Sequence, residues 1–381
     1  MNTAGNPEKA RRWLEEARSR TPHHSDGSIL GSMTTAPHPI GVEAFKEFIH
    51  VNGNDPVIYP VVEEASRILI EGVGALLGAE HGIHTSGGTE SNILALYIGR
   101  RISRGRENTV VAPSSVHRSI DKACLLMGCR LVKIPVDPLK PVDPGVLEEY
   151  VRKHKPFAVV VTAGTTEAGV VDPVKEAGEI AEEHGVFLHV DAAYGGLLIP
   201  FLHRRGYLAE DLRMYPGVSS ISVDMHKNGC APIPSSILFL SRRDYIEEAC
   251  FEMEYMPRGR SCGLLGTRPG GAVIAAAAVF MTIGAKGYEE NAVRMMENAL
   301  YLHENLSHLP MITSYKPILP LNVFKSTIYT YEELFKALLD RKLYVYKSPS
   351  LQALRVVVMP HVEKAHLDRL INALKSIHGV Q

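Results

Sequence analysis

Residues 157–196, FAVVVTAGTTEAGVVDPVKEAGEIAEEHGVFLHVDAAYGG, contain the pattern that decides the fold. Two continuous apolar runs, FAVVVTA and VFLHV, are separated by a predicted helix at 173–184. Apolar runs without alternation are typical of strands that are buried on both faces, as in a parallel sheet covered by helices. The stretch therefore predicts a strand, a helix and a second strand parallel to the first.

The same alternation continues on both sides of this stretch, between about residues 82 and 240. The other predicted helices lie at 89–104, 116–127 and 143–154. Seven runs are predicted strands: GIHTS, TVVA, RLVKIPV, FAVVVTA, VFLHV, SSISV and SILFL. The pattern predicts an α/β fold with a mainly parallel seven-stranded sheet and helices on both faces.

The C-terminal part of the chain has a different pattern. Short apolar runs such as PLNVFKS and ALRVVVM alternate with predicted helices at 330–340 and 362–378. Such a pattern is typical of a small α+β domain. A chain of 381 residues is also long for a single core. We therefore expect an N-terminal segment at 1–42, a large domain at 43–305 and a small C-terminal α+β domain at 306–381.

Composition and charge argue against several classes of partner. The formal net charge is -1, so there is no excess of positive charge to attract nucleic acid or an anionic membrane surface. The most apolar stretch, GGAVIAAAAVFMTIG at 270–284, is shorter than the roughly 18 residues that span a bilayer, and we expect a buried helix there. The polar N-terminus lacks the apolar stretch of a signal peptide. We expect a cytoplasmic protein that binds neither nucleic acid nor membrane.

The five cysteines, at 124, 129, 230, 250 and 262, form no CxxC pair and are odd in number. This pattern favours reduced thiols over a disulfide framework or a zinc site. The seventeen histidines include no HExxH or comparable ligand spacing. We therefore predict no metal site.

Residues 85–92, TSGGTESN, follow a predicted strand and begin a helix. Gly87 and Gly88 allow a ligand to approach the backbone, and Thr89 offers a hydroxyl in the first turn. Free N–H groups and the helix dipole favour an anion at this position; an ordinary N-cap is the alternative. Because neither a Walker lysine nor GxGxxG is present, a small phosphorylated cofactor fits better than a nucleotide.

Three more side chains follow predicted strands of the same sheet. Asp191 ends the run FLHVD, where a buried carboxylate must be paired, by a ligand or by a structural partner. His117, in PSSVHRSIDKA, is placed to stack on a ring or to fill the core. Lys227, in SVDMHKNG, follows the run SSISV. Ligands of open α/β sheets bind beyond the carboxyl ends of the strands, so we expect these side chains to meet.

Together these groups fit one ligand, pyridoxal 5'-phosphate. Lys227 would form a Schiff base with its aldehyde, and His117 would stack on its ring. Asp191 would keep the pyridine nitrogen protonated. A charge pair about 4 Å apart at an effective dielectric of about 20 contributes roughly 4 kcal/mol, or about 3 pKa units, which is enough to hold that proton at neutral pH.

The assembled motifs resemble the group II pyridoxal-phosphate-dependent decarboxylases of fold type I, and most closely the archaeal L-tyrosine/L-aspartate decarboxylases. The resemblance implies a homodimer with active sites at the subunit interface, which decarboxylates an L-amino acid. The matching stretches lie in order between residues 29 and 361: ILGSMTTAPHP, SGGTESN, HRSIDKA, AGTTEAGVVD, HVDAAYGGLLIPF, DMHKNGCAPIPSSILF, LGTRPGG and LRVVVMPH.

Carried over by position, the resemblance implies several cofactor contacts within one chain. Gly88 and Thr89 would bind the phosphate. Thr166 would lie near the 3-hydroxyl of the ring, and Ala193 would pack against one face of the ring. His226 would contact the phosphate or help in proton transfer.

The resemblance also implies roles for residues later in the chain. Gly266 and Thr267 would reach the phosphate of the partner subunit. Arg355 would lie near the substrate carboxylate. Tyr255 would belong to a mobile catalytic loop, although the sequence around it departs from the family's pattern.

The family's pattern D-P-H-K reads DMHK in this chain. We expect Met225, in place of the proline, to loosen the turn. Asp224 would repel a phosphate dianion, so we expect it to cap backbone N–H groups or to pair with a cation.

The substrate class depends on the charges near the site. Arg258, Arg260 and Arg268 could pair with a side-chain carboxylate, which favours L-aspartate, giving the coenzyme A precursor β-alanine, over L-tyrosine, giving tyramine. The alternative activity is a carbon–carbon lyase of a phosphorylated amino alcohol, similar to sphingosine-phosphate lyase. An aminotransferase or a non-catalytic protein fits less well, because Lys227 is present with its whole setting.

Overall fold

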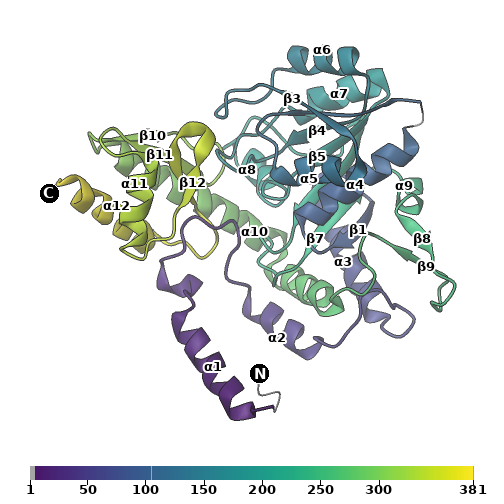
Figure 1. The fold of residues 1–381 in the computed structure, drawn as a ribbon, viewed down its shortest axis with the longest axis horizontal. Helices are drawn as coiled ribbons and strands as arrows, with labels where there is room; N and C mark the ends of the chain where they lie inside the picture. Colours follow the sequence, from purple (N-terminus) through teal and green to yellow (C-terminus); the bar gives the residue numbers. More distant parts are fainter. Residues whose placement is uncertain (1–4, 104, 381) are drawn as a thin grey trace.

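A seven-stranded sheet organises the larger part of the computed structural model, which describes residues 5–103 and 105–380 (Figure 1). The strand order is β1-β7-β6-β5-β4-β2-β3, and only β7 runs antiparallel to its neighbours. The mainly parallel seven-stranded sheet is confirmed. The strands are β1 (His81–Thr85), β2 (Glu107–Pro113), β3 (Arg130–Ile134), β4 (Pro156–Thr162), β5 (Phe187–Asp191), β6 (Val218–Asp224) and β7 (Ser236–Leu240).

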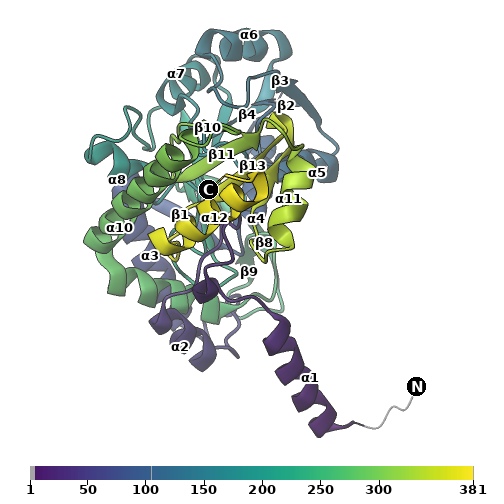
Figure 2. The same cartoon turned by 90° about the vertical axis from the view of Figure 1, so that its left-hand side faces the viewer.

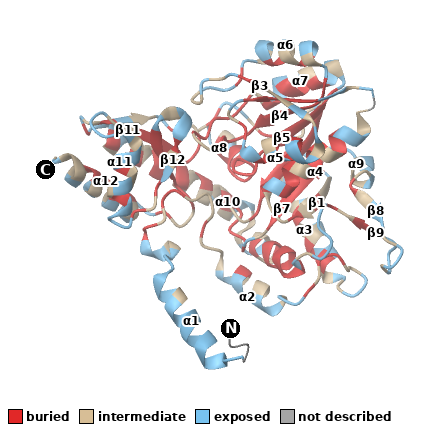
Figure 3. Cartoon of the chain, viewed as in Figure 1, coloured by how far each residue is buried: buried red, intermediate tan, exposed pale blue. Residues whose placement is uncertain are grey.

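Helices cover both faces of this sheet because its central strands are apolar on both sides. Every residue of β4 is buried, as Figure 3 shows for most of the sheet. Val160 belongs to a core cluster that includes Leu94 of α4, whereas Val161 belongs to a cluster that includes Val174 of α7. The helices of this domain are α3 (Val61–Leu77), α4 (Gly88–Ile102), α5 (Arg118–Met127), α6 (Pro144–His154), α7 (Val174–His184), α8 (Ile199–Arg204) and α9 (Asp244–Glu247).

A four-stranded antiparallel sheet forms a second, smaller unit near the C-terminus. Its strand order is β10-β11-β13-β12. This unit confirms the predicted small C-terminal α+β domain. Its elements are β10 (Ile312–Tyr315), β11 (Leu321–Ser326), α11 (Tyr331–Leu339), β12 (Tyr346–Ser348), β13 (Ala353–Val357) and α12 (Lys364–His378).

The long helix α10 (Gly270–Ser307) joins the two units. It packs against α3 and α2 (Pro39–Glu47) of the large domain and against α12, β10 and β11 of the small one. At Gly284 the backbone leaves the helical conformation, with φ 62° and ψ 171°, in a region that favours glycine. Among the described helices, α10 alone is long and apolar enough to cross a membrane, but half of its most apolar window is buried within the protein. That burial is typical of a core helix.

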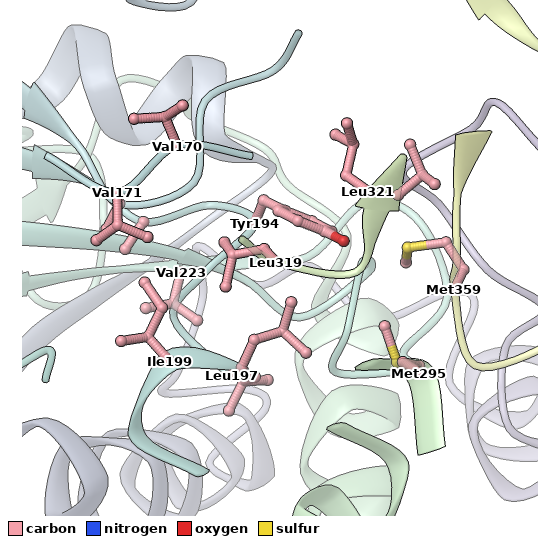
Figure 4. Close-up of a cluster of buried hydrophobic side chains, with 14 of the residues drawn as sticks. Val170, Val171, Tyr194, Leu197, Ile199, Val223, Met295, Leu319, Leu321 and Met359 are labelled. Atoms are coloured by element: carbon pink, nitrogen blue, oxygen red, sulfur yellow. The ribbon is translucent and has the colours of Figure 1, made fainter. Parts of the chain in front are cut away.

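Apolar side chains from both units meet beside the sheet (Figure 4). Tyr194 and Leu197 follow β5, whereas Leu319 and Leu321 come from the small domain. Tyr194 is 2% exposed, and its hydroxyl donates to the carbonyl oxygen of Pro320 at 2.9 Å. The contact holds the small domain against the segment that follows β5.

The N-terminal residues pack partly on the small domain. The backbone N–H of Leu30 donates to the carbonyl oxygen of Tyr344 at 3.1 Å, and that of Val357 donates to the carbonyl oxygen of Leu30 at 2.8 Å. Helix α1 (Pro7–Arg20) has no buried residue and projects from the rest of the chain (Figure 2). The domain limits at 42 and 305 stay a prediction.

A short hairpin corrects the expectation for the cysteines. Its strands, β8 (Cys250–Glu252) and β9 (Arg260–Cys262), place Cys250 and Cys262 directly opposite each other, and a disulfide joins them. The expectation that all five cysteines are reduced is therefore wrong. The short motifs considered in the sequence could not show this pair, because a hairpin brings together cysteines that are 12 residues apart.

Candidate active site

The carboxyl ends of β1, β4, β5 and β6 meet at a cavity of about 420 Å³. This edge of an open α/β sheet is where ligands bind. Other residues of the cavity, such as Met33, Asn92, Tyr194 and Ile233, were not predicted from the sequence. The predicted residues that line it are Gly88, Thr89, His117, Thr166, Asp191, Ala193, His226 and Lys227.

Four predicted site residues are not among the described residues that line this cavity. Tyr255 lies between β8 and β9 with 84% of its surface exposed, and its hydroxyl donates to Sδ of Met253 at 3.3 Å. Gly266 and Thr267 are exposed in the loop before α10. Arg355 is buried in β13. The structure does not bring Tyr255 to the cavity of its own chain, and its catalytic role stays a prediction.

The start of α4 is shaped for the close approach of an anion. Its N-cap, Gly87, has no capping side chain. A Cβ atom on Gly88 would lie 3.0 Å from Cβ of Ala193 and 3.2 Å from both carboxylate oxygens of Asp224. Only glycine therefore fits at residue 88 without displacing its neighbours. The backbone N–H groups and the dipole of α4 favour negative charge at this point.

Asp191, the last residue of β5, is held by a neighbouring amide. Nδ2 of Asn92 donates to Oδ2 of Asp191 at 2.7 Å and to Oγ of Ser119 at 2.8 Å. The backbone N–H of Ala193 donates to the other carboxylate oxygen at 3.1 Å. Asp191 is only 5% exposed, and these hydrogen bonds offset part of the cost of burying its charge.

His189 orients the same amide from the opposite side. Its Nε2 donates to Oδ1 of Asn92 at 2.8 Å, and its Nδ1 accepts from Oγ of Ser220 at 2.8 Å. Burial lowers the pKa of His189 to about 4, although Asp191 opposes the shift. The ring is therefore neutral near pH 7. Sequence reasoning missed this network, and the available signal was a histidine inside an apolar run, which needs partners when it is buried.

Lys227 lies in the turn after β6. Its Nζ is 3.0 Å from Oδ2 of Asp224, and Nε2 of His226 is 3.5 Å from the same oxygen. The prediction that Asp224 pairs with a cation is confirmed. Met225 is fully buried, and its backbone N–H donates to the carbonyl oxygen of Ser235 at 3.0 Å, a bond that a proline could not form. The expected loosening of the turn stays a prediction.

His117 caps α5 and faces the cavity. Its Nδ1 accepts from the backbone N–H of Ser119 at 3.2 Å. Desolvation lowers the pKa of His117, an effect that Asp191 partly opposes. The neutral ring that results is suited to stacking on a flat ligand.

Thr166 lines this cavity and also an adjoining one of about 560 Å³, which Ser350 of the small domain helps to enclose.

Arg355 is a buried cation with free donors. The residue is only 6% exposed, and its Nε and Nη1 have no hydrogen-bond partner among the described residues. Its Cζ lies 5.3 Å from the ring centroid of Tyr346. Its charge opposes the rise in pKa that burial causes at Tyr194, a residue of the cavity wall. An anionic ligand would satisfy these free donors.

The three arginines that favoured aspartate lie away from the cavity. Arg258 forms an ion pair with Glu63, and Arg260 forms one with Glu247 at 2.7 Å. Arg268 donates to backbone carbonyl oxygens. All three line a separate cavity of about 270 Å³. They therefore give no support for a side-chain carboxylate in the site around Lys227.

One group of potential metal ligands occurs within the described part of the chain. Glu148, Glu183 and His184 offer ligand atoms within 4.8 Å of one another. They belong to α6 and α7, and none of them lines the cavity around Lys227. The chemistry of that cavity does not involve this group.

Comparison with known proteins identifies relatives over nearly the whole chain. A family model described as the pyridoxal-dependent decarboxylase conserved domain matches residues 40–326. A probable L-tyrosine/L-aspartate decarboxylase of Methanocella arvoryzae is 37% identical over 96% of each chain. The L-tyrosine/L-aspartate decarboxylase of Methanocaldococcus jannaschii is 31% identical over 96% of this chain and 95% of its own length. A probable L-aspartate decarboxylase of Archaeoglobus fulgidus is 33% identical over 92% and 94%, respectively.

Solved structures show the same fold. The sphingosine-1-phosphate lyase of Burkholderia pseudomallei superposes with a TM-score of 0.88 and 26% identity, over 100% of this chain and 92% of that one. The glutamate decarboxylase of Lactobacillus brevis gives a TM-score of 0.87 at 20% identity, over 100% and 94%, and at that identity it shows the fold alone. The fold by itself therefore accommodates both decarboxylases and a lyase.

The Asn92 network should stabilise the fold as well as orient Asp191. We expect Asn92→Ala to lower the free energy of unfolding by about 1–3 kcal/mol, because Asp191 and His189 each lose a buried partner. Chemical denaturation of the cofactor-free protein measures the effect. The control is Asn108→Ala, which removes an exposed hydrogen bond to the carbonyl oxygen of Gly128 and should change stability by less than about 0.5 kcal/mol. Equal stability of the two variants would contradict the role of the network.

Proposed function

The chain belongs to the pyridoxal-dependent decarboxylase family and is a pyridoxal-phosphate-dependent amino-acid decarboxylase, and we propose that the cavity around Lys227 is its active site. The observation that carries this proposal is the convergence of three groups on one cavity. Lys227, Asp191 and the start of α4 at Gly88 all line it. Lys227 follows β6, Asp191 ends β5 and Gly88 follows β1, three strands of one sheet.

The residues of the cavity fit pyridoxal phosphate at three points. The start of α4 would hold the phosphate, since no side chain caps its first backbone N–H groups at Gly87. Asp191, oriented by Asn92, would accept a hydrogen bond from the protonated pyridine nitrogen. Lys227 would bond to the aldehyde carbon. When bound, the cofactor supplies an electron sink for the bond that breaks.

Other side chains of the cavity would position the ring and exclude water. His117 would stack on one face and Ala193 would pack on the other, with Thr166 near the 3-hydroxyl. Thr162 also lines the cavity, and its buried hydroxyl has no partner among the described residues. We assign it a hydrogen bond to the bound ligand, because a buried hydroxyl without a partner is costly. His226 would move a proton at Nε2.

Arg355 would bind the α-carboxylate of the substrate. A buried guanidinium needs an anionic partner, and two of its donor nitrogens are free among the described residues. The contact of Tyr194 with Pro320 holds the small domain, and with it Arg355, against the cavity wall. Fixing the carboxylate would orient the bond that breaks relative to the ring.

Two amino acids are the proposed substrates, L-aspartate and L-tyrosine, after which the relatives are named. The products would be β-alanine and tyramine. Lys227 is the single Lys or Arg among the described residues that line the cavity. An aspartate side chain would therefore need a cation from outside this set, whereas a tyrosine side chain would not. We therefore no longer favour L-aspartate over L-tyrosine as the substrate.

The lyase alternative has less support. A phosphorylated amino alcohol would need a second phosphate site beside the cofactor. Arg258 and Arg260, which left this possibility open, are engaged in ion pairs with Glu63 and Glu247. The sphingosine-1-phosphate lyase shares 26% identity with this chain, below the 31–37% of the relatives named above as decarboxylases.

A homodimer would supply further hydrogen-bond donors for the cofactor phosphate. Glu90, Asp191 and Asp224 line the cavity with one lysine, so the phosphate dianion would meet an excess of negative charge within one chain. The exposed loop with Gly266 and Thr267 is available to a partner. Backbone N–H groups and a hydroxyl from the partner's loop would then help to bind the phosphate.

A cytoplasmic location is retained as a proposal. The disulfide between Cys250 and Cys262 removes the support that reduced thiols would have given, because structural disulfides are uncommon in the cytoplasm of most organisms.

The cofactor bond and the substrate can be tested together. We expect the protein with pyridoxal phosphate to absorb near the visible edge, and borohydride to attach the cofactor to the peptide that contains Lys227. Lys227→Ala should lose both signals, whereas Lys122→Ala, which replaces an exposed lysine, should keep them. Carbon dioxide release with L-aspartate or L-tyrosine, and the matching amine product, then identifies the substrate. A protein that stays colourless after reconstitution would contradict the proposed site.

The variant Arg355→Met tests whether Arg355 contributes to substrate binding and not to the stability of the fold. We expect kcat/KM to fall about 10- to 100-fold, because a charged hydrogen bond to the carboxylate contributes about 1.5–3 kcal/mol. The stability of the cofactor-free protein should be unchanged or higher, because an unpaired buried charge is replaced by an apolar chain. Steady-state kinetics and thermal unfolding measure the two effects. Unchanged kcat/KM would remove Arg355 from the site.

Mixing two inactive variants tests the shared site. Lys227→Ala and Thr267→Asp would each inactivate a homodimer, the second by placing a carboxylate near the partner's phosphate. In a 1:1 mixture about half of the dimers are mixed, and one of the two sites in each is intact. Activity should then return to about a quarter of the wild-type value, with native mass spectrometry confirming the exchange. Full activity of Thr267→Asp alone, or no recovery after exchange, would contradict the assignment.

A further inference from the structure

Asp224 is a buried acid that the proposed chemistry does not yet use. It ends β6 and is 3% exposed. Its Oδ2 lies 3.0 Å from Nζ of Lys227 and 3.5 Å from Nε2 of His226. Its Oδ1 has no hydrogen-bond partner among the described residues. Both oxygens also lie beside the start of α4, 3.2 Å from the place of a Cβ atom on Gly88.

The hydrogen bonds of His226 determine which of its nitrogens faces Asp224. Nδ1 lies 2.7 Å from the carbonyl oxygen of Ser235. The backbone N–H of Ser235 also lies 3.2 Å from Nδ1. A carbonyl oxygen only accepts, so the shorter of the two contacts places the hydrogen on Nδ1. Nε2 is therefore the nitrogen that can gain or lose a proton, and it is the one that faces Asp224.

The other two acids of the cavity have partners of their own. Glu90 accepts from the backbone N–H of Ser86 at 2.7 Å, and Asp191 accepts from Asn92 at 2.7 Å. Among the described residues, Lys227 and His226 are the basic side chains that lie within 4 Å of the Asp224 carboxylate. A buried carboxylate that loses its only cation is strongly destabilising. When Lys227 bonds to an aldehyde, its nitrogen no longer serves as an ammonium ion, and His226 is the remaining partner within reach.

We propose that Asp224 is a positioning residue that alternates between two cations. It holds Lys227 as an ammonium ion whenever the lysine is free, and it pairs with protonated His226 while Lys227 is bonded to the cofactor aldehyde. The proposal rests on the proposed role of Lys227.

The proton and the atoms balance in this exchange. The Lys227 ammonium gives one proton to Nε2 of His226. The neutral amine then adds to the aldehyde carbon, the nitrogen–carbon double bond forms, and the aldehyde oxygen leaves as water. When the substrate amine takes over that carbon, Lys227 is released and recovers the proton from His226. Asp224 then keeps the lysine charged, so that it does not compete with the substrate for the cofactor.

Labelling of the cofactor-free protein tests the first half of the proposal. Acetic anhydride acylates neutral amines, and peptide mass spectrometry compares Lys227 with the exposed Lys122 in the same sample. We expect Asp224→Asn to raise the Lys227/Lys122 ratio about tenfold or more, because a nearby negative charge no longer favours the ammonium form. Asp224→Glu, which keeps the charge, should stay close to the wild-type ratio and covers the case in which Asp224→Asn does not fold.

Asp172→Asn is the matched control for replacing a buried acid. Asp172 is 1% exposed and accepts from the backbone N–H groups of Val142 and Thr162. Its replacement should leave the ratio within about twofold, since it removes no carboxylate beside Lys227. A wild-type ratio in folded Asp224→Asn, or an equal rise in Asp172→Asn, would overturn the proposal.

The rate at which the protein captures the cofactor tests the second half. Borohydride stops the reaction at set times, and the fraction of modified Lys227 is counted. We expect His226→Gln to slow capture at least about tenfold, because the proton acceptor is gone, and to leave the labelling ratio of Lys227 within about twofold. Unchanged capture would overturn the exchange with His226. Failure of the proposed function is distinguishable, because wild-type protein would then trap no cofactor at all, whatever the labelling ratio.

Discussion

Two carboxylates at the ends of adjacent strands set the constraint on which the site depends. Asp191 ends β5 and Asp224 ends β6, and both are almost fully buried. Parallel pairing places strand ends at one edge of the sheet, so the topology that buries the apolar strands also brings these charges together. Asn92, which His189 orients, compensates one of them, and Lys227 lies 3.0 Å from the other, with His226 at 3.5 Å. The polar network around the cavity is therefore a consequence of where the chain leaves the sheet.

Much of this arrangement could be predicted from sequence because it depends on local patterns. The apolar runs predicted all seven strands of the large sheet, and residues directly after the strands, such as Asp191 and Lys227, were expected to meet. The polar support behind Asp191 could not be predicted, since its members come from α4, α5, β5 and β6 and none of them forms a recognisable motif in the sequence. Asn92 becomes informative only when its four hydrogen bonds are seen together.

The errors of sequence reasoning arose where pairing is not local. Arg258 and Arg260 lie close together in the chain, and they were taken as a charge available to substrate. In the structure, each meets a carboxylate from elsewhere in the fold. Cys250 and Cys262 were likewise judged by spacing, whereas the β8–β9 hairpin sets them opposite each other.

Within a single chain, the charged side chains near the site are unbalanced in two places. Around Lys227 the cavity wall carries three acids and one lysine, while Nε and Nη1 of the buried Arg355 have no partner in the described part of the chain. An anion near Arg355 and further donors near the start of α4 would each relieve a cost that the isolated chain bears. In the proposed complex, the substrate carboxylate would be the first, and the exposed loop of a second subunit would supply the second. The same imbalance of charge would thus link substrate binding, cofactor binding and assembly. All three would act on the cavity that Lys227 and Asp224 line.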